Sequence, residues 1–491
     1  MENRPNTLGE LEASDWRPRS VREEIRRNLL EAIRSGSTVE ERWPGIHGYH
    51  KTVLPQIENA ILSRHDFILL GLRGQAKTRI LRMMTHFLDP YLPALAGCDL
   101  NDDPFAPLSR KGRELVRDQG RDAPLRWIGA EERYREKLAT PDVTIADLIG
   151  DIDPIKAAAR RLSLDDEEVI HFGIIPRTNR GIFAINELPD LSPRIQVGLL
   201  NLLEERDIQL RGFPVRLQLD MLFLFSANPE DYTNRGAIIT PLRDRIASQI
   251  LTHYPPTLEV ARHITDQEAR LDRDGVKVHL PGFLRDVIEE VAFQARRSEF
   301  IDQQSGVSVR LTTALLENVV SNAERRGLHL GLDSVCARPA DLFAADSAVT
   351  GKVELVLEGE REGPAAVADR LLGDGLSAVF LKHFPAPYAA ERSPREGAQP
   401  QDAYKPLVDW FARGNTVVVQ DGEEAGEELL RVPGLPELVR KHLDPAPVDL
   451  PAACELVLEG LHRASVLAKD RSQDGVSYGD LLKRMFAGFE D

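Results

Sequence analysis

With 491 residues, the chain is too long for a single hydrophobic core, and its length predicts two or three domains. The net charge of −16 argues against nucleic-acid binding through a global positive field. Three widely separated cysteines indicate a reducing compartment and no zinc site, and because neither a signal-peptide core nor a bilayer-length apolar run is present, we expect a cytoplasmic protein that does not bind a membrane.

The pattern of apolar residues in the N-terminal part of the chain predicts two helices and a strand. Apolar residues recur at one-turn spacing over residues 21–33, and Ser20 precedes them in the position of a helix cap. A second helical pattern, at 53–61, leads into the apolar run 66–70, which is typical of a buried strand.

A glycine-bearing loop that ends in Lys77-Thr78 lies between this strand and a helical pattern over 79–87. This is the layout of a P-loop, in which backbone N–H groups wrap phosphate oxygens and the helix N-terminus adds positive potential. Lys77 can reach the β- and γ-phosphates, and the Thr78 hydroxyl can hold Mg²⁺. The candidate nucleotide-binding residues are Gly71, Arg73, Gly74, Gln75, Ala76, Lys77, Thr78 and Arg79.

The loop departs from the P-loop motif in one place, because Ala76 stands where the motif has its last glycine. On these residues alone, an ordinary strand, turn and helix with a surface lysine is the alternative. Residues 88–140, which follow the helix, are charged and helix-prone, and they lie where an insertion or a lateral helix would be.

A second apolar strand, residues 181–187, ends in Asn186-Glu187. In P-loop ATPases this strand ends in two carboxylates, of which the first orients the Mg²⁺ shell and the second polarises the attacking water. Glu187 is therefore the candidate base. Asn186 can accept a hydrogen bond from a metal-bound water but lacks the charge, so an aspartate at position 186 is expected to tighten Mg²⁺-ATP binding and to raise turnover. The alternative is a buried strand with a polar end.

The pattern then predicts a β-hairpin over 208–219 that turns at Gly212, and a third apolar strand at 221–227. This strand leads to Asn228, and a polar residue at such a strand end can lie beside the γ-phosphate. Towards the C-terminus we expect a strand at 416–419 and helices at 435–439 and 456–467, the last with Gly460 as a weak point.

In order and spacing, the three strand ends resemble those of an AAA+ ATPase. Residues 71–78 resemble the P-loop of MoxR-like ATPases, where alanine before Lys-Thr is usual, and residues 186–205 resemble their Walker B strand and the helix after it. Residues 143–185 are similar to the magnesium chelatase I subunit, in which this stretch forms an insert in the second helix of the core.

The resemblance implies roles for three more residues. Asn228 corresponds to sensor 1, and Arg245 to the arginine finger that reaches the neighbouring subunit's ATP, with Arg243 as the second candidate. Arg310 opens a helix whose apolar spacing fits the lid, and it is the candidate for sensor 2; the alternative is a surface arginine at a helix start.

The resemblance also implies ligands and partners. ATP and Mg²⁺ are the expected cofactors, with Thr78 and Asn186 nearest the metal. A homo-oligomeric ring, expected to be a hexamer, would hold ATP between subunits. The family generally acts with a partner that bears a von Willebrand A domain, often in metal or cofactor insertion or in the maturation of a complex.

The expected fold class is α/β. A P-loop AAA+ core, with a parallel sheet flanked by helices and a helix-2 insert, is followed by an α-helical lid and a small α-rich C-terminal region. The expected boundaries are an N-terminal helical extension at 1–39, the core at 40–255 with its insert near 143–180, the lid at 256–345, and the C-terminal region at 346–491 with a linker near 385–406.

Three functions stay open at this point. The first is an ATP-hydrolysing remodelling ATPase that acts with a partner protein. The second is a nucleotide-gated scaffold with weak or no hydrolysis, because Asn186 lacks the carboxylate charge. The third is a DNA-acting AAA+ ATPase, since replicative helicases share the helix-2 insert; the acidic balance and the absence of a recognisable DNA-binding module disfavour nucleic acid as a partner.

Overall fold

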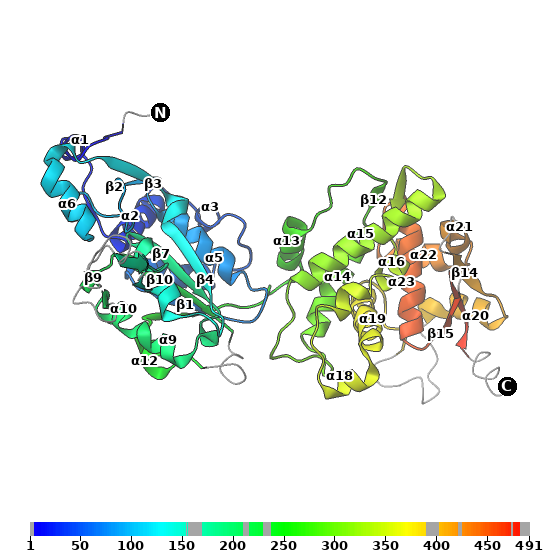
Figure 1. Cartoon of the computed structure of the whole chain (residues 1–491). Helices are drawn as coiled ribbons and strands as arrows, with labels where there is room; N and C mark the ends of the chain where they lie inside the picture. The colour runs from blue at the N-terminus through cyan, green and yellow to red at the C-terminus, as the bar shows by residue number, and fades with distance from the viewer. Residues whose placement is uncertain are drawn as a thin grey trace. The chain divides into compact units, whose positions relative to one another are not determined.

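The chain forms two compact units, Met1–Tyr254 and Pro255–Asp491 (Figure 1). The computed structural model describes residues 4–153, 155, 169–209, 216–228, 237–388, 402–420, 425–472 and 475–481. The hairpin turn predicted at Gly212 and most of the linker predicted near 385–406 lie outside these residues. Within them, no helix is long and apolar enough to cross a membrane.

The first unit is built on a five-stranded parallel sheet with the strand order β11-β1-β10-β7-β4. The five strands are β1 (Phe67–Leu70), β4 (Tyr134–Leu138), β7 (Gly181–Asn186), β10 (Met221–Ala227) and β11 (Ser248–Leu251). The three apolar strands predicted from the sequence are β1, β7 and β10. Strands β7 and β10 are buried along their whole length, as expected for parallel strands covered on both faces.

Helices cover the two faces of this sheet. On one face, α2 (Val21–Arg34), α4 (Val53–Leu62) and α5 (Lys77–Met83) pack against alternate side chains of β1, β7 and β10. On the other face lie α9 (Pro193–Gly198) and α10 (Leu200–Glu204). The N-terminal helix predicted after Ser20 is therefore α2, and the Ser20 side chain accepts a hydrogen bond from the backbone N–H of Glu23, as a helix cap does.

Among the described residues of the first unit, three antiparallel strand pairs lie outside the main sheet: β2 with β3, β5 with β6, and β8 with β9. Their bounds are β2 (Tyr91–Leu95), β3 (Leu125–Gly129), β5 (Gly150–Ile152), β6 (Ile170–Phe172), β8 (Asp207–Gln209) and β9 (Arg216–Gln218). The last pair is the stem of the hairpin that the sequence predicted. The remaining helical elements are α1 (Leu8–Glu12), α3 (Val39–Arg42), η1 (Met84–Phe87), α6 (Arg110–Gln119), η2 (Gly120–Asp122), η3 (Ala130–Arg133), α7 (Ile145–Leu148), η5 (Pro176–Thr178), η6 (Leu188–Asp190) and α12 (Thr240–Arg245).

Residues 88–140 differ from the expectation of a helix-prone insertion. They contribute the helix α6, the antiparallel pair β2–β3 and the edge strand β4 of the main sheet. Strand β4 carries Arg135 and Lys137 among its five residues, so no apolar run marks it. An edge strand needs to bury less of its surface than a central strand, and charged side chains there limit edge-to-edge association.

The second unit is mostly helical (Figure 1). Its helices are α13 (Leu258–Glu268), α14 (Gly282–Ala295), α15 (Arg310–Leu330), α16 (Pro339–Phe343), α17 (Ser347–Thr350), α18 (Leu357–Glu362), α19 (Pro364–His383), η8 (Asp402–Tyr404), α20 (Lys405–Ala412), α21 (Ala425–Leu430), α22 (Leu435–His442), η9 (Pro447–Asp449) and α23 (Leu450–Arg463). Its strands form a parallel pair, β12 (Lys277–His279) with β13 (Ser334–Cys336), and a three-stranded sheet of β14 (Val417–Gln420), β16 (Gly475–Asp480) and β15 (Leu467–Ser472).

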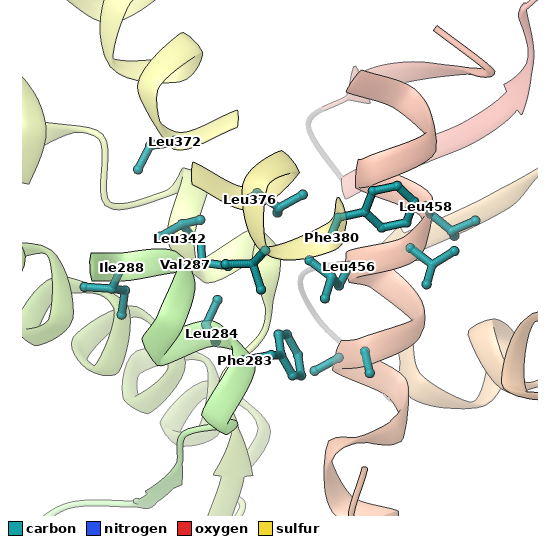
Figure 2. Close-up of a cluster of buried hydrophobic side chains, with 14 of the residues drawn as sticks. Phe283, Leu284, Val287, Ile288, Leu342, Leu372, Leu376, Phe380, Leu456 and Leu458 are labelled. Carbon is teal, nitrogen blue, oxygen red and sulfur yellow. The ribbon is translucent and has the colours of Figure 1, made fainter. Parts of the chain in front are cut away.

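One hydrophobic core holds the second unit together. Figure 2 shows side chains of α14, α16, α19 and α23 meeting in it. Gly460 of α23 lies against the Phe380 ring of α19, where a Cβ would be only 2.4 Å from the ring, so this position of the helix accepts glycine alone. The predicted lid and the predicted C-terminal region both contribute to this core, and the boundary between them stays a prediction.

A buried ion pair fastens α2 to the sheet. Glu24 and Arg133 are 2% and 1% exposed, and the two guanidinium Nη atoms donate to the two carboxylate oxygens at 2.7 Å. Arg133 also donates from Nε to the Arg180 carbonyl, and Glu24 accepts from the backbone N–H of Asp89 at 2.6 Å. Both charges are thus hydrogen-bonded within the first unit.

We expect Glu24→Ala to lower the free energy of unfolding of the first unit by about 3–5 kcal/mol, because it leaves the Arg133 guanidinium buried without its carboxylate. Urea unfolding followed by tryptophan fluorescence measures this. The control is Glu31→Ala on the same helix, which removes an exposed ion pair with Arg27 and is expected to cost at most about 0.5 kcal/mol. Equal midpoints for the two variants would contradict the prediction.

Candidate functional site

The parallel register brings the predicted site residues to one edge of the sheet. Leu70 of β1 pairs with Ala227 of β10, so Gly71 and Asn228 both follow a paired position. Ile185 of β7 pairs with Phe225, which places Asn186 beside Ser226. Because the carboxyl ends of parallel strands meet at one edge, the loop and the two polar strand ends form one site.

The loop itself has the backbone of a phosphate cradle. Gly74 and Ala76 adopt φ values of +75° and +57°, and α5 begins directly afterwards at Lys77. Glycine accepts this conformation freely, whereas Ala76 holds it at a cost in strain. Gly71 is required for a different reason, because a Cβ there would lie 1.9 Å from the Thr252 hydroxyl oxygen. Such a loop turns successive backbone N–H groups inwards, where they can bind an anion.

Lys77 connects the loop to the neighbouring strand. Its side chain is buried, and Nζ donates to the carbonyl oxygens of Gly71 and Leu72 and to Oδ1 of Asn228, the last at 2.8 Å. The predicted phosphate-binding lysine and the predicted sensor residue, 151 positions apart, are therefore in direct contact. Of the other candidates in and after the loop, Gln75 is buried, whereas Arg73 and Arg79 are exposed.

The loop rests on residues that sequence reasoning did not assign. The Thr252 hydroxyl donates to Oε1 of Gln75 at 2.6 Å. The Tyr49 hydroxyl lies 3.1 Å from the Gln75 carbonyl and 2.7 Å from the His253 carbonyl, and burial raises the pKa of Tyr49. Nothing local in the sequence marks Thr252 as a residue of the site.

The residues next to the loop fit a magnesium-bound nucleotide. Thr78 is half-buried in the first turn of α5, Asn186 is buried, and Glu187 follows it with the backbone in the left-handed region at φ +56°. Hydroxyl, amide and carboxylate oxygens are the ligands that Mg²⁺ prefers. These oxygen-bearing side chains and the anion-binding loop are therefore both compatible with a nucleotide that carries Mg²⁺.

The two candidate finger arginines lie in α12. Arg245 donates from Nε to Glu204 at 2.7 Å and from Nη1 to the Pro241 carbonyl at 3.0 Å, both within its own chain. Arg243 is exposed, and because the segment is helical, residues two positions apart point in different directions. The structure thus pairs Arg245 with Glu204, an acidic residue of α10.

Arg310 belongs to the second unit. It is the first residue of α15, and its side chain is exposed. The assignment of Arg310 as sensor 2 stays a prediction, as do the catalytic roles of Glu187, Asn228 and Arg245.

The fold and the site together define a class. A five-stranded parallel sheet in the order β11-β1-β10-β7-β4, with a glycine-bearing loop and a helix after β1 and polar ends on β7 and β10, is a P-loop α/β core. The mostly helical second unit follows it, as the sequence predicted for the fold class.

No family model and no curated protein matches the chain. Solved structures that resemble it include a "putative ATPase" from Cytophaga hutchinsonii ATCC 33406, which is 16% identical over 72% of this chain and 95% of that chain, with a TM-score of 0.29. NtrX from Brucella abortus is 12% identical over 53% of this chain and 48% of that chain, with a TM-score of 0.30. Hsp104 in its closed state with ATPγS and casein is 12% identical over 68% of this chain and 52% of that chain, with a TM-score of 0.38. At these TM-scores the similarities carry no argument, and the fold rests on the strand order and the loop.

We expect Lys77→Ala to weaken ATP binding by about 10- to 100-fold, because a charged hydrogen bond to phosphate is worth roughly 1.5–3 kcal/mol. Titration of the full-length protein with a fluorescent ATP analogue measures the dissociation constant. Lys111→Ala, which changes an exposed lysine of α6 that contacts only the Gly97 carbonyl among the described hydrogen bonds, is the control and should leave the affinity unchanged. Unchanged affinity in Lys77→Ala would refute the assignment of the loop.

Proposed function

We propose that the protein binds and hydrolyses ATP with Mg²⁺, as an AAA+ remodelling ATPase. The observation that carries this proposal is the contact between Lys77 of the loop and Asn228 of the neighbouring strand, with Asn186-Glu187 at the same edge. Lys77 and the loop N–H groups would bind the phosphates, and Mg²⁺, held by Thr78 and the phosphate oxygens, would neutralise part of their charge.

In this proposal Glu187 activates the attacking water, and Asn228, which lies beside Lys77, helps to position that water. Asn186 stands at the metal shell as an amide. Arg245, released from Glu204, would offset transition-state charge on the ATP of the next subunit in a ring, for which a hexamer is the expected size. Arg310 would contact the nucleotide as sensor 2.

The finer assignment rests on the resemblance of residues 71–78 and 143–205 to MoxR-like and magnesium chelatase-like ATPases. We propose on that basis a cytoplasmic protein that acts with a partner bearing a von Willebrand A domain, in metal or cofactor insertion or in the maturation of a complex. Pull-down of a tagged chain from its native host, with and without ATP, tests whether such a partner binds.

A nucleotide-gated scaffold is the second candidate. Two observations favour it: position 186 carries an amide in place of a carboxylate, and Arg245 is bound by Glu204 of its own chain. The scaffold would bind ATP but turn it over slowly or not at all.

Glu187→Gln separates the two candidates. Removal of a general base should lower the steady-state rate of Mg²⁺-dependent ATP hydrolysis by about 10²-fold or more while ATP binding persists. Glu205→Gln, an exposed glutamate in the turn after α10, is the matched control. A wild-type rate equal to that of Glu187→Gln would favour the scaffold.

Mixed rings test whether the finger acts between subunits. If Arg245 acts in trans, mixing Arg245→Ala subunits with Glu187→Gln subunits should restore part of the ATPase activity, because some interfaces then pair an intact Glu187 with an intact Arg245. A finger in trans can be worth about 10³–10⁵ in rate, so even a small recovered fraction is measurable.

The same mixing with Arg243→Ala provides the comparison. If Arg243→Ala subunits are inactive alone but regain activity when mixed with Glu187→Gln subunits, while Arg245→Ala subunits stay active alone, the finger is Arg243. No recovery with either variant, despite demonstrated co-assembly, would contradict a finger in trans.

A further inference from the structure

The second unit contains a cavity that the proposed function does not use. It has a volume of about 500 Å³, and its lining residues come from α15, α16, α23 and the strands β15 and β16. Sites for small ligands typically measure about 300–1,000 Å³, so the cavity is of a suitable size for one. None of the residues assigned to the nucleotide is among its described lining residues.

Helix α15 lines the cavity with hydrogen-bond donors. Asn322, Arg325, Arg326 and His329 all line it, and their spacing of three and four residues places them on one side of the helix. Arg325 and His329 are exposed, and Arg325 donates from Nη2 to the Asn322 side-chain oxygen at 2.7 Å. Side chains of this kind bind carboxylates and other anions.

Arg326 is fixed in its place on this helix. Its Nη2 donates to the Cys336 carbonyl at 2.9 Å and to Oδ2 of Asp341 at 2.8 Å. Its Nε is buried, and no residue in the described part of the chain accepts a hydrogen bond from it. Arg326 therefore keeps one unused donor on a guanidinium that is already oriented.

Helix α23 lines the cavity with two buried carboxylates, of which Glu455 has an oxygen to spare. Glu455 is 2% exposed, and its Oε1 accepts from the backbone N–H of Ala340 at 2.7 Å. Its Oε2 is buried, and among the described residues it has no hydrogen-bond partner. Such an oxygen carries a desolvation cost that a bound donor would remove.

The charge of Glu455 calls for a cationic donor. Burial raises the pKa of Glu455 to about 7, although the Arg338 guanidinium opposes this, so a cation beside the carboxylate would favour its ionised form. Glu459, one turn further along α23, is different, because its Oε1 accepts from Lys469 and from the Tyr478 hydroxyl, the latter at 2.7 Å. Glu455 is thus the carboxylate that a ligand would use.

We propose that this cavity binds a small zwitterion with the chemistry of a free α-amino acid. Its ammonium group would donate to Oε2 of Glu455, and its carboxylate would accept from Arg325 and Arg326. Leu330 and Phe343, which also line the cavity, offer apolar surface to a side chain. A simple anion would meet the acidic side chains of α23, and a simple cation would meet the basic side chains of α15, whereas a molecule with both charges suits both.

A neighbouring cavity makes Arg325 the informative residue. Arg326, Leu330 and Glu455 also line a second cavity, of about 540 Å³. Arg325 is a lining residue of the first cavity and not of the second, whereas Arg338 lines only the second. An effect of Arg325 on binding therefore assigns the ligand to the first cavity.

The test uses the full-length protein without nucleotide, so it does not depend on the proposed ATPase function. Thermal unfolding is measured with each standard amino acid in turn, because a ligand that binds the native state raises the midpoint. Isothermal titration then gives the Kd of each amino acid that raises it. We expect at least one to bind, and its matching α-hydroxy acid and its decarboxylated amine to bind at least about 10-fold more weakly, since each lacks one charged hydrogen-bonding group.

Two variants connect the binding to the cavity. Glu455→Gln removes the charge, while the glutamine oxygen can still accept from Ala340, and the Kd of the amino acid should rise by about 10- to 100-fold. Arg325→Gln should raise it by about 10-fold. The control is Arg413→Gln, which changes an exposed arginine at the end of α20 that is not a lining residue, and it should leave the Kd unchanged.

The exposed Arg325 keeps the test decisive even if Glu455→Gln fails to fold, which circular dichroism would reveal. The inference is overturned if no standard amino acid raises the midpoint, or if the α-hydroxy acid binds as tightly as the amino acid. An unchanged Kd in folded Glu455→Gln or in Arg325→Gln would also overturn it. None of these results bears on ATP binding, which Lys77→Ala tests separately.

Discussion

The parallel register of β1, β10 and β7 is the constraint on which the site depends. Three segments that are far apart in the sequence become functional neighbours only because their strands end at one edge of one sheet. Each apolar strand can be buried on both faces, and the glycine-bearing loop after β1 and the polar residues Asn186 and Asn228 meet where the hydrogen-bonded ladder stops. A slip of one residue in either pairing would turn Asn186 or Ser226 to the opposite face.

Buried charge holds the framework around this sheet. Although the chain is strongly acidic, several of its carboxylates lie inside the first unit in hydrogen-bond networks. Asp66 accepts from Arg22 and Arg206, each at 2.5 Å, and from the backbone N–H of Phe223 at 2.9 Å. With Glu24 and Arg133, these contacts tie α2 to the sheet. If one partner were lost, the other charge would stay buried without its counter-charge. The free-energy cost of such a buried, unpaired charge explains why α2 stays packed against the sheet.

Much of the first unit could be predicted from the sequence. The apolar runs lead into the glycine-bearing loop at Gly71 and into the polar residues Asn186-Glu187 and Asn228, a local signal that predicted the strands, the loop and the position of the site. The edge strand β4 carries no such run, because Arg135 and Lys137 alternate with other polar side chains. Sequence reasoning therefore missed both the strand and the carboxylate of Glu136, which the strand places opposite Ala184 of β7.

Only the tertiary structure decided which residues meet. Alone, Asn186 is a lost charge, but in the fold its amide oxygen accepts from the Ser226 hydroxyl at 3.1 Å, and Glu136 of the neighbouring strand lies on the same face of the sheet. Arg245 is likewise directed by Glu204, 41 positions away. Propensity and periodicity are local properties, whereas these contacts depend on which strands pair and how closely helices approach. The sequence by itself determined the elements and the polar ends of the strands; the register of the sheet and the packing of the helices determined their partners.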